Sequence, residues 1–193
     1  MGAAQVVRLS VEEYLALDRG SDLPSEYHDG EVFPMENASL RHGLVHINVG
    51  ALFLERLRGR DCRIVNQTRI RINLRRYVYP DLVVYCGKPQ FVDSEQDMLT
   101  NPKVIIEILS PRTADYDYGS KFALYRELPS LEEYVLVAQS QPKVEIFRKG
   151  SDGRWVLSSY TGLDANAKIE SLQIDVPLSQ VYAGVEFDPA AEA

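Results

Sequence analysis

One acidic residue lies inside an apolar stretch of the chain and is the clearest candidate for chemistry. Residues 103–109 have the sequence Lys-Val-Ile-Ile-Glu-Ile-Leu, which predicts a strand whose side chains alternate between two faces. Both faces are apolar except at Glu107, as in a strand at the centre of a covered sheet. Burying a polar group without a partner costs on the order of 2–7 kcal/mol, and an unpaired charge costs more. Glu107 therefore needs a cationic side chain or a metal ion beside it.

A second carboxylate is expected on a neighbouring strand. Residues 77–85 are rich in β-branched and aromatic side chains, and Asp81 lies near the start of this segment, directly after Pro80. Proline is tolerated at the first position of a strand because it has no N–H to donate to a ladder. We expect Asp81 and Glu107 to cluster where these two strands lie side by side.

A lysine is expected to face the same region from a helix. Residues 115–128 are predicted to be helical, with Asp115 or Asp117 as the N-cap and Pro129 ending the helix. Lys121 precedes three apolar residues at helical spacing, so it lies at the head of the stripe that should face the core. A lysine in this position is as unusual as a glutamate in a covered strand, and the two can pair with each other.

Two carboxylates and a lysine are the groups used in metal-dependent phosphodiester cleavage. Carboxylates bind a hard cation such as Mg²⁺, which stabilises developing charge and lowers the pKa of a bound water. The lysine stabilises charge on phosphorus or positions the water. The purely structural alternative is a salt bridge between Glu107 and Lys121, with Asp81 as a turn residue after proline.

Longer motifs resemble those of the Uma-type endonuclease family, a branch of the PD-(D/E)xK restriction-endonuclease-like superfamily. The resemblance covers residues 10–185 and is carried by His42 and four segments: EYHDGE at 26–31, PDLVV at 80–84, IEILSPRT at 106–113 and YDYGSKFALYRELPSLEEY at 116–134. It implies Asp81 and Glu107 as metal ligands, Lys121 as the catalytic lysine and Glu26 as an acid ahead of the core. The superfamily pattern would place the lysine at position 109, which is Leu109 here, so the resemblance implies that Lys121 replaces it from the following helix.

The order of elements predicts an α/β fold. Helices are expected at 10–18, 39–58 and 115–128, a hairpin at 26–35 around Asp29-Gly30, and a last helical turn at 177–182. Further strands are expected at 63–65, 68–74, 133–138, 143–148, 155–160 and 169–174. The strand–helix–strand order from 103 to 138 predicts parallel pairing. This agrees with the mixed sheet flanked by helices, an αβββαβ core with extra C-terminal strands, that the resemblance implies. The second helix and the Lys121 helix should lie on opposite sides of the sheet.

Length and composition are those of an ordinary globular protein. We expect one domain over residues 1–193, with the core at about 10–185 and a frayed tail at 186–193. The chain is 45% hydrophobic and 25% charged, and no apolar run or secretory signal indicates a membrane or an export route. Cys62 and Cys86 are expected to be free, buried thiols, which suits a reducing compartment. These features predict a cytoplasmic protein.

Charge is distributed unevenly along the chain. The net charge is −7, yet residues 56–76 contain eight arginines and one acid. Arginine suits bidentate phosphate contact, so this stretch could guide a polyanion to an acidic metal site. Four of these residues are candidates for nucleic-acid binding: Arg69, Arg71, Arg75 and Arg76. The alternative is a solvated strand–turn–strand whose outward positions are arginine.

Histidines at positions 42 and 46 share one helical face. Their spacing can hold zinc, but Gly43 replaces the glutamate of the usual zinc motif and no third ligand is evident. A partly buried pair is the better interpretation, and the resemblance favours His42 as a residue at the edge of the site. His28 has no comparable support.

The sequence therefore predicts an endonuclease that hydrolyses DNA with Mg²⁺ or Mn²⁺. Asp81, Glu107 and the backbone carbonyl of Ile108 would bind the ion, Lys121 would support the attacking water, and Glu26 would assist. A homodimer is expected because cleavage of two strands needs two sites. The alternatives are a non-catalytic nucleic-acid-binding or interaction module with the same fold, and a phosphodiesterase acting on RNA or a small molecule.

Overall fold

The structure is a computed structural model and describes residues 8–35 and 38–187. The helical elements are α1 (Val11–Arg19), α2 (Leu40–Arg56), α3 (Ala114–Tyr116), the π-helical turn η1 (Asp117–Lys121), α4 (Phe122–Tyr125) and α5 (Leu178–Val181). The strands of the main sheet are β3 (Cys62–Asn66), β6 (Leu82–Cys86), β8 (Val104–Leu109), β9 (Glu133–Ala138), β10 (Lys143–Lys149) and β11 (Trp155–Thr161). The other strands are β1 (Ser25–His28), β2 (Glu31–Pro34), β4 (Arg69–Asn73), β5 (Arg76–Val78), β7 (Met98–Leu99), β12 (Asn166–Ile169) and β13 (Ile174–Pro177).

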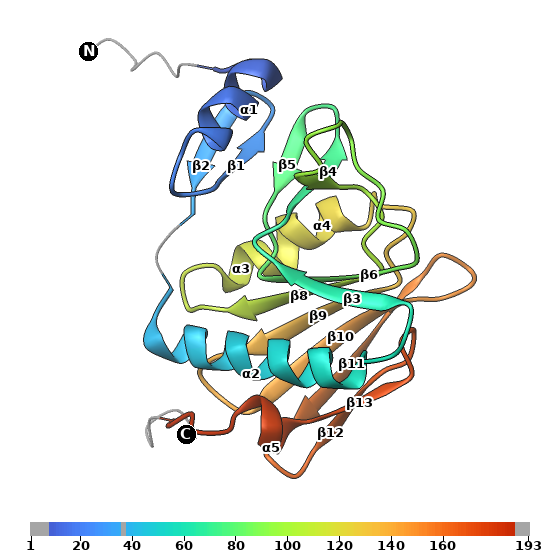
Figure 1. Ribbon diagram of the computed structural model, residues 1–193. Helices are drawn as coiled ribbons and strands as arrows, with labels where there is room; N and C mark the ends of the chain where they lie inside the picture. The colour runs from blue at the N-terminus through green and yellow to red at the C-terminus, as the bar shows by residue number, and fades with distance from the viewer. Residues whose placement is uncertain (1–7, 36–37, 188–193) are drawn as a thin grey trace.

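The main sheet is mixed, as expected. Its strand order is β11-β10-β9-β8-β6-β3, with β8 and β9 parallel and the other neighbours antiparallel. The helical segment from α3 to α4 connects β8 to β9, which confirms the predicted crossover and parallel pairing. The α/β fold class, a mixed sheet flanked by helices, is confirmed (Figure 1).

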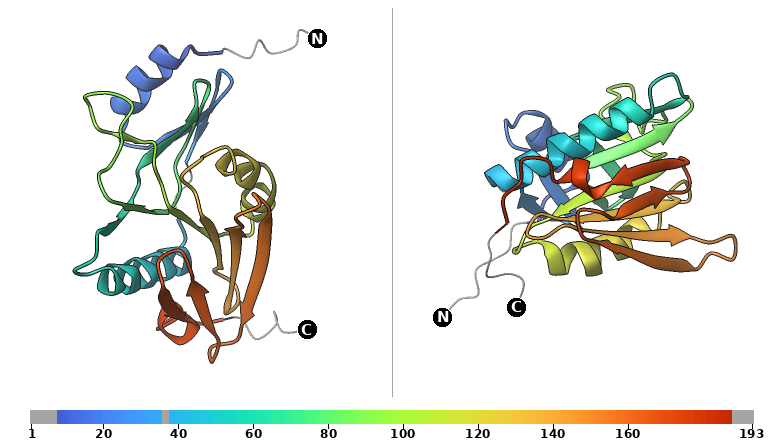
Figure 2. Two further views of the ribbon diagram at one scale, coloured as in Figure 1. Left: turned by 90° about the vertical axis from the view of Figure 1, so that its right-hand side faces the viewer. Right: turned by 90° about the horizontal axis from the view of Figure 1, so that it is seen from below.

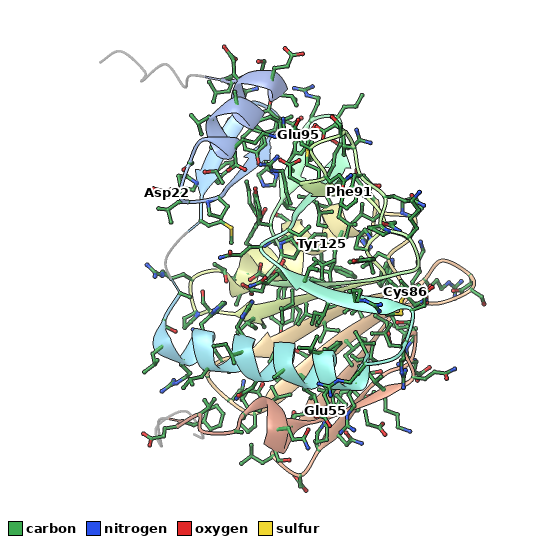
Figure 3. The ribbon with its side chains drawn as sticks, viewed as in Figure 1. Asp22, Glu55, Cys86, Phe91, Glu95 and Tyr125 are labelled. Carbon is green, nitrogen blue, oxygen red and sulfur yellow. A yellow bond between two sulfur atoms is a disulfide. The ribbon has the colours of Figure 1, made fainter. Side chains whose placement is uncertain are left out.

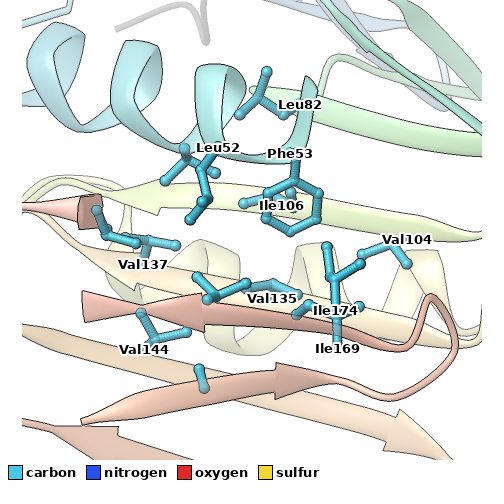
Figure 4. Close-up of a cluster of buried hydrophobic side chains, with 14 of the residues drawn as sticks. Leu52, Phe53, Leu82, Val104, Ile106, Val135, Val137, Val144, Ile169 and Ile174 are labelled. Carbon is cyan, nitrogen blue, oxygen red and sulfur yellow. The ribbon is translucent and has the colours of Figure 1, made fainter. Parts of the chain in front are cut away.

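Helices cover both faces of this sheet. On one face, Leu52 and Phe53 of α2 pack in one buried cluster with Ile106 of β8 and Val135 of β9 (Figure 4). On the other face, the α3–α4 segment packs in a second cluster that contains the opposite side chains of the same strands. The prediction that α2 and the Lys121 helix lie on opposite sides is therefore confirmed. Glu107 belongs to the α4 side, as the alternation along β8 requires.

A second sheet sits beside the first and has the order β2-β1-β5-β4-β7 (Figure 2). The β1–β2 hairpin turns at Asp29 and Gly30, both with positive φ, which is the conformation that an Asp-Gly hairpin turn requires. Ser10 and Glu13 form the predicted capping box of α1. Tyr14 of α1 packs against Tyr27 and Tyr77, and so fixes this sheet beneath the helix.

Three expected elements differ in the structure. The single strand at 77–85 is two strands, β5 and β6, that belong to different sheets, because Pro80 interrupts the ladder between them. The segment at 169–174 spans the turn of the β12–β13 hairpin and is not a strand of its own. The expected caps of the third helix are also wrong, since Thr113 precedes it and Asp117 lies inside it, buried. Most of the expected tail lies outside the described residues.

The two cysteines form a disulfide, which corrects the expectation of free thiols. Cys62 and Cys86 are directly opposite each other in the antiparallel pair of β3 and β6, with Cα atoms 4.0 Å apart. A close cross-strand position of this kind brings two Cβ atoms near each other. The two cysteines are 24 residues apart in the sequence, and this spacing alone does not indicate that they lie opposite each other. The pairing removes the reason for expecting a reducing compartment.

Removing this disulfide is expected to destabilise the protein. Closing a loop of this length restricts the unfolded chain by about 3 kcal/mol in the chain-entropy estimate. The double substitution Cys62→Ala with Cys86→Ala should lower the free energy of unfolding in urea by about that amount. Unchanged stability would mean that the two thiols are reduced in the protein as isolated, and titration of free thiols in the unfolded wild type would report this directly.

Arg69 is buried in an ion-pair network, and this corrects its assignment as a nucleic-acid contact. Its guanidinium lies 2.5 Å from Asp18 and 3.3 Å from Asp97, and it donates a hydrogen bond to Tyr79 Oη at 2.9 Å. The residue is 3% exposed. It therefore joins α1 to the second sheet and has no surface to offer to a phosphate.

Arg69→Met is expected to cost about 3–5 kcal/mol of stability, because Asp18 would be left buried without its cation. Arg75→Met is the matched control: Arg75 belongs to the same arginine stretch but its side chain is 67% exposed, so its loss should change stability by less than about 0.5 kcal/mol. Urea denaturation of the two variants measures this difference. Equal stability of the two variants would contradict the structural role of Arg69.

Among the residues that the structure describes, no helix combines the length and the apolar character needed to cross a membrane.

Candidate active site

Asp81 and Glu107 lie next to each other where β6 and β8 pair. Leu82 of β6 is in register with Ile106 of β8, which places the preceding residue, Asp81, beside Glu107. The backbone N–H of Asp81 donates to Glu107 Oε2 at 3.2 Å, and the N–H of Ile108 donates to Asp81 Oδ2 at 2.7 Å. The Glu107 carboxylate thus accepts from the backbone of Asp81, and the Asp81 carboxylate accepts from the backbone of Ile108, the residue after Glu107.

Lys121 reaches this pair from the π-helical turn. Its Nζ lies 2.9 Å from Glu107 Oε1 and 3.2 Å from Glu26 Oε1, and it donates to the carbonyl of Tyr79 at 3.3 Å. Lys121 is 6% exposed. A π turn inserts an extra residue into a helix and often marks a functional site. This geometry agrees with the expectation that Lys121 pairs with Glu107. Leu109 occupies the position at which the superfamily pattern has its lysine.

Glu26 belongs to the same cluster although it comes from the second sheet. Its Oε1 accepts the N–H of Tyr79 at 3.1 Å, and its Oε2 accepts the hydroxyl of Tyr116 at 3.0 Å. His28 Nε2 lies 3.3 Å from the same Oε2 and 3.1 Å from the Tyr116 hydroxyl. Strand β1 therefore places an acid and a histidine at the junction of the two sheets.

Some residues of this cluster, among them His28 and Tyr125, had no functional assignment in the sequence. The sequence gives His28 no support as a site residue. The available signal is that His28 follows Glu26 by two residues on a strand, so the two side chains share one face. Tyr125 is one of the residues at helical spacing after Lys121 that the sequence directs toward the core, yet its hydroxyl donates to Glu107 Oε1 at 2.7 Å. Figure 3 shows Tyr125 in the interior between the two sheets. Its position four residues after Lys121 placed it on the same helical face, which was the signal for its role.

The histidines of α2 contact Asp81 from the other side. His42 Nε2 lies 3.4 Å from Asp81 Oδ2, and His46 Nε2 lies 3.1 Å from the Asp81 carbonyl oxygen. Their rings are nearly parallel, with centroids 6.4 Å apart. His42 Nδ1 is buried, and none of the residues that the structure describes forms a hydrogen bond with it. Both histidines hold Asp81, which places His42 at the edge of the site.

Three carboxylates contact the buried ammonium group of Lys121, because Asp117 approaches it at 3.9 Å in addition to Glu107 and Glu26. Burial raises the pKa of Glu107 to about 8 even though Lys121 opposes the shift, and burial raises the pKa of Asp117 to about 6. The pKa of Glu26 is lowered to about 2, since Lys121 and its hydrogen-bond donors outweigh burial. The cluster carries more negative charge than its own cations neutralise.

The pKa values of Asp81 and His42 both shift in the direction that favours an ion pair between them. Burial alone would raise the pKa of Asp81, but the nearby His42 outweighs it and lowers that pKa. Burial would lower the pKa of His42, and Asp81 outweighs it in turn. For Lys121, the surrounding carboxylates overcome burial and raise its pKa well above the usual value.

The donor set fits a hard divalent cation in its chemistry. Asp81 and Glu107 supply carboxylate oxygens, and Mg²⁺ is commonly held by one or two carboxylates while it keeps several waters. Burial is the main cause of the raised pKa of Glu107, and a cation bound beside it would favour the ionised carboxylate. Within the described parts of the chain, no group of three or more His, Cys, Asp or Glu side chains is arranged to hold a metal.

The sequence profile of the Uma2 family, described as putative restriction endonuclease, matches residues 11–179. The chain belongs to the Uma2 family. The uncharacterized protein slr1290 of Synechocystis sp. is 33% identical over 187 residues, which is 96% of this chain and 97% of that protein. The uncharacterized protein sll1609 of the same organism is 33% identical over 168 residues, covering 86% of this chain and 95% of that protein.

The Uma2 fold is also found in a solved structure. A putative nuclease belonging to DUF820 from Anabaena variabilis matches with a TM-score of 0.76, covering 92% of this chain and 99% of that chain. The two sequences are 15% identical, so the match concerns the fold. The expected family and the expected fold class are both confirmed.

The three other candidate arginines of this Uma2 protein lie on the second sheet or in its β4–β5 turn. Arg75 and Arg76 both pair with Asp29, at 3.2 and 3.0 Å, and Arg76 also approaches Glu127 at 3.8 Å. Arg71 is half-buried on β4. Unlike Arg69, these three arginines retain surface that a phosphate can reach.

Proposed function

We propose that this chain is an endonuclease that hydrolyses DNA phosphodiester bonds with Mg²⁺ or Mn²⁺. The observation that supports this most is the buried Lys121, which contacts Glu107 and Glu26 directly beside Asp81. Glu107 of the main sheet, Glu26 of the second sheet and Lys121 of the helical segment converge there. A purely structural salt bridge would need one carboxylate for the lysine, whereas this site has an excess of acids.

Asp81, Glu107 and the carbonyl of Ile108 would hold the ion. When bound, Mg²⁺ supplies positive charge for the phosphate oxygens and makes water more acidic. The chain's own residues fix the geometry: the N–H of Ile108 orients Asp81, and the hydroxyl of Tyr125 orients Glu107. His42 holds the Asp81 carboxylate from α2.

Lys121 is the residue proposed to support the attacking water and the charge on phosphorus. Its ammonium is fixed by acceptors on three sides, so it is oriented before substrate binds, and preorganised charge of this kind is a large source of rate enhancement. Glu26 holds the ammonium in place, and Tyr116 and His28 hold Glu26.

DNA is the proposed partner, and the three arginines of the second sheet and its turn that keep some exposed surface are proposed to contact it. Arg71, Arg75 and Arg76 are the candidate phosphate contacts, and the low overall basicity of the chain predicts weak, salt-sensitive binding. The proposal includes a homodimer, because cutting both strands requires two sites.

A non-catalytic binding module is the second candidate. The observation in its favour is that the acids of the site already have protein partners, as in a structural network. A module of this kind would bind DNA and leave it intact with any metal.

Plasmid cleavage tests the proposal. Supercoiled plasmid is incubated with the wild type and Mg²⁺, Mn²⁺ or EDTA, beside Asp81→Asn, which keeps the size and an acceptor for the Ile108 N–H. Asp175→Asn, an exposed acid on β13, is the control. We expect cleavage by the wild type and the control with metal alone, and a loss of about 10²–10³ in rate for Asp81→Asn. Equal cleavage by all three proteins would indicate a contaminant, and binding without cleavage would favour the module.

A further inference from the structure

Helix α2 exposes a second apolar face that the fold does not use. Its inner face carries Val45, Val49, Leu52 and Phe53 and packs on the main sheet. Its outer face carries the apolar residues Leu40, Leu44, Ile47, Ala51 and Leu54, called here the α2 stripe. Contiguous exposed apolar surface of this kind marks an interaction site in soluble proteins.

The α2 stripe has the spacing of a helix–helix seam. Its residues follow one another at steps of four, three, four and three, the heptad spacing with which one helix packs along another. Leu40 is 83% exposed, Ile47 68% and Leu54 60%, although all are large apolar side chains. In Figures 1 and 2 the helix runs along the outside of the molecule.

We infer that the α2 stripe is the surface through which two copies of this chain form an antiparallel homodimer. The homodimer itself is part of the proposed function, but this surface is argued from α2 alone and does not depend on cleavage.

Antiparallel packing gives the stripe a complementary register with its own copy. With the two-fold axis near residues 49 and 50, Leu44 packs against the partner subunit's Leu54, and Ile47 packs against the partner subunit's Ala51. Gly50 then lies beside its own copy. Gly50 carries no side chain, so the two helix backbones can approach closely there.

Charges beside the stripe favour the same alignment. Arg41 and Glu55 flank it near opposite ends of α2, and the antiparallel register brings each one opposite the other in the partner chain. Figure 3 shows Glu55 on α2. A parallel alignment would place Gly50 opposite Glu55, with no cationic partner. Flanking charges of this kind set orientation more than affinity.

The contact is short, because 17 residues of helix span roughly 25 Å. Interfaces at the small end of the range are weak and depend on concentration. The dimer should therefore dissociate on dilution, and the measurement must cover a range of protein concentrations.

Sedimentation equilibrium of the metal-free protein tests the surface. We expect a wild-type dimer that dissociates on dilution, and a dissociation constant raised at least about 30-fold by Ile47→Glu, which places a charge at the centre of the seam. Leu74→Glu is the matched control, because Leu74 is a 74% exposed apolar residue outside α2 and should not affect the dimer. A wild type that is monomeric throughout, or a dimer that Val156→Glu on β11 separates while Ile47→Glu does not, would overturn the inference.

Cysteine cross-linking tests the register, with the native disulfide left intact. The double variant Leu44→Cys with Leu54→Cys should form a covalent dimer on mild oxidation, while each single variant should remain monomeric. The two positions are about 15 Å apart within one helix, too far to bond to each other. Single variants that cross-link as well as the double variant would show that the antiparallel register is wrong. Neither experiment uses DNA or metal, so a negative result would contradict the dimer surface and would leave the proposed cleavage activity to be tested on its own.

Discussion

Lys121→Met is expected to abolish plasmid cleavage and to destabilise the protein strongly. The substitution keeps an apolar chain of similar length but removes the ammonium group that contacts Glu107, Glu26 and Asp117. Removing one partner of a buried ion pair costs about 3–5 kcal/mol, because the other charge remains buried. The cleavage rate should fall by about 10²–10³ or more, measured under conditions in which circular dichroism shows the variant to be folded.

The instability of Lys121→Met should depend on pH in a defined direction. In the wild type, Lys121 helps to lower the pKa of Glu26 to about 2, below its usual value. A carboxyl with a lowered pKa stabilises the fold above its unfolded pKa and loses this contribution as the pH falls toward 2. Without the lysine that contribution is lost, so the variant should be closer to the wild type at pH 4 than at pH 8.

Lys168→Met, an exposed lysine on β12, is the control for this experiment and should match the wild type at both pH values. A Lys121→Met protein that cleaves plasmid within about twofold of the wild-type rate would remove Lys121 from the proposed mechanism, whatever its stability.

Glu107→Gln is expected to lose cleavage without the same loss of stability. The glutamine keeps the shape and an oxygen that accepts from Tyr125, but it removes a charge that burial disfavours. A carboxyl whose folded pKa is raised to about 8 destabilises the fold increasingly as the pH rises from about 4.5 to 8, because only the unfolded state ionises freely. The stability of the variant relative to the wild type should therefore increase between pH 5 and pH 9.

The effect of metal on stability distinguishes the proposed role of Glu107 as a metal ligand from its effect on the stability of the fold. An ion at about 100 times its dissociation constant adds ~2.7 kcal/mol to the native state, so Mn²⁺ should raise the melting temperature of the wild type. Glu107→Gln should show little of this shift. A Mn²⁺ shift of equal size in both proteins would mean that the ion binds elsewhere.

Local patterns predicted much of this site. The alternation along residues 103–109 correctly placed Glu107 on the face opposite Ile106 and Ile108, and the helical stripe correctly turned Lys121 toward the sheet. These predictions succeed because each depends on one element with a fixed period. The pairing of β6 with β8 then brings Asp81 to Glu107.

Contacts between distant elements were harder to predict. The position of Glu26 depends on how a second sheet meets the first, and nothing in its short hairpin specifies that arrangement. The burial of Arg69 depends on Asp18 of α1, which is 51 residues away, so an arginine in a basic stretch looked like surface. The disulfide likewise depends on the register of β3 against β6.

Anomalous diffraction from crystals grown with Mn²⁺ tests the central claim most directly, because it locates the ion and its ligands together. We expect one peak in direct contact with the carboxylates of Asp81 and Glu107, with Lys121 Nζ beside it. Crystals that show no peak there at saturating Mn²⁺, or a peak held by other residues, would contradict a metal-dependent active site at this junction.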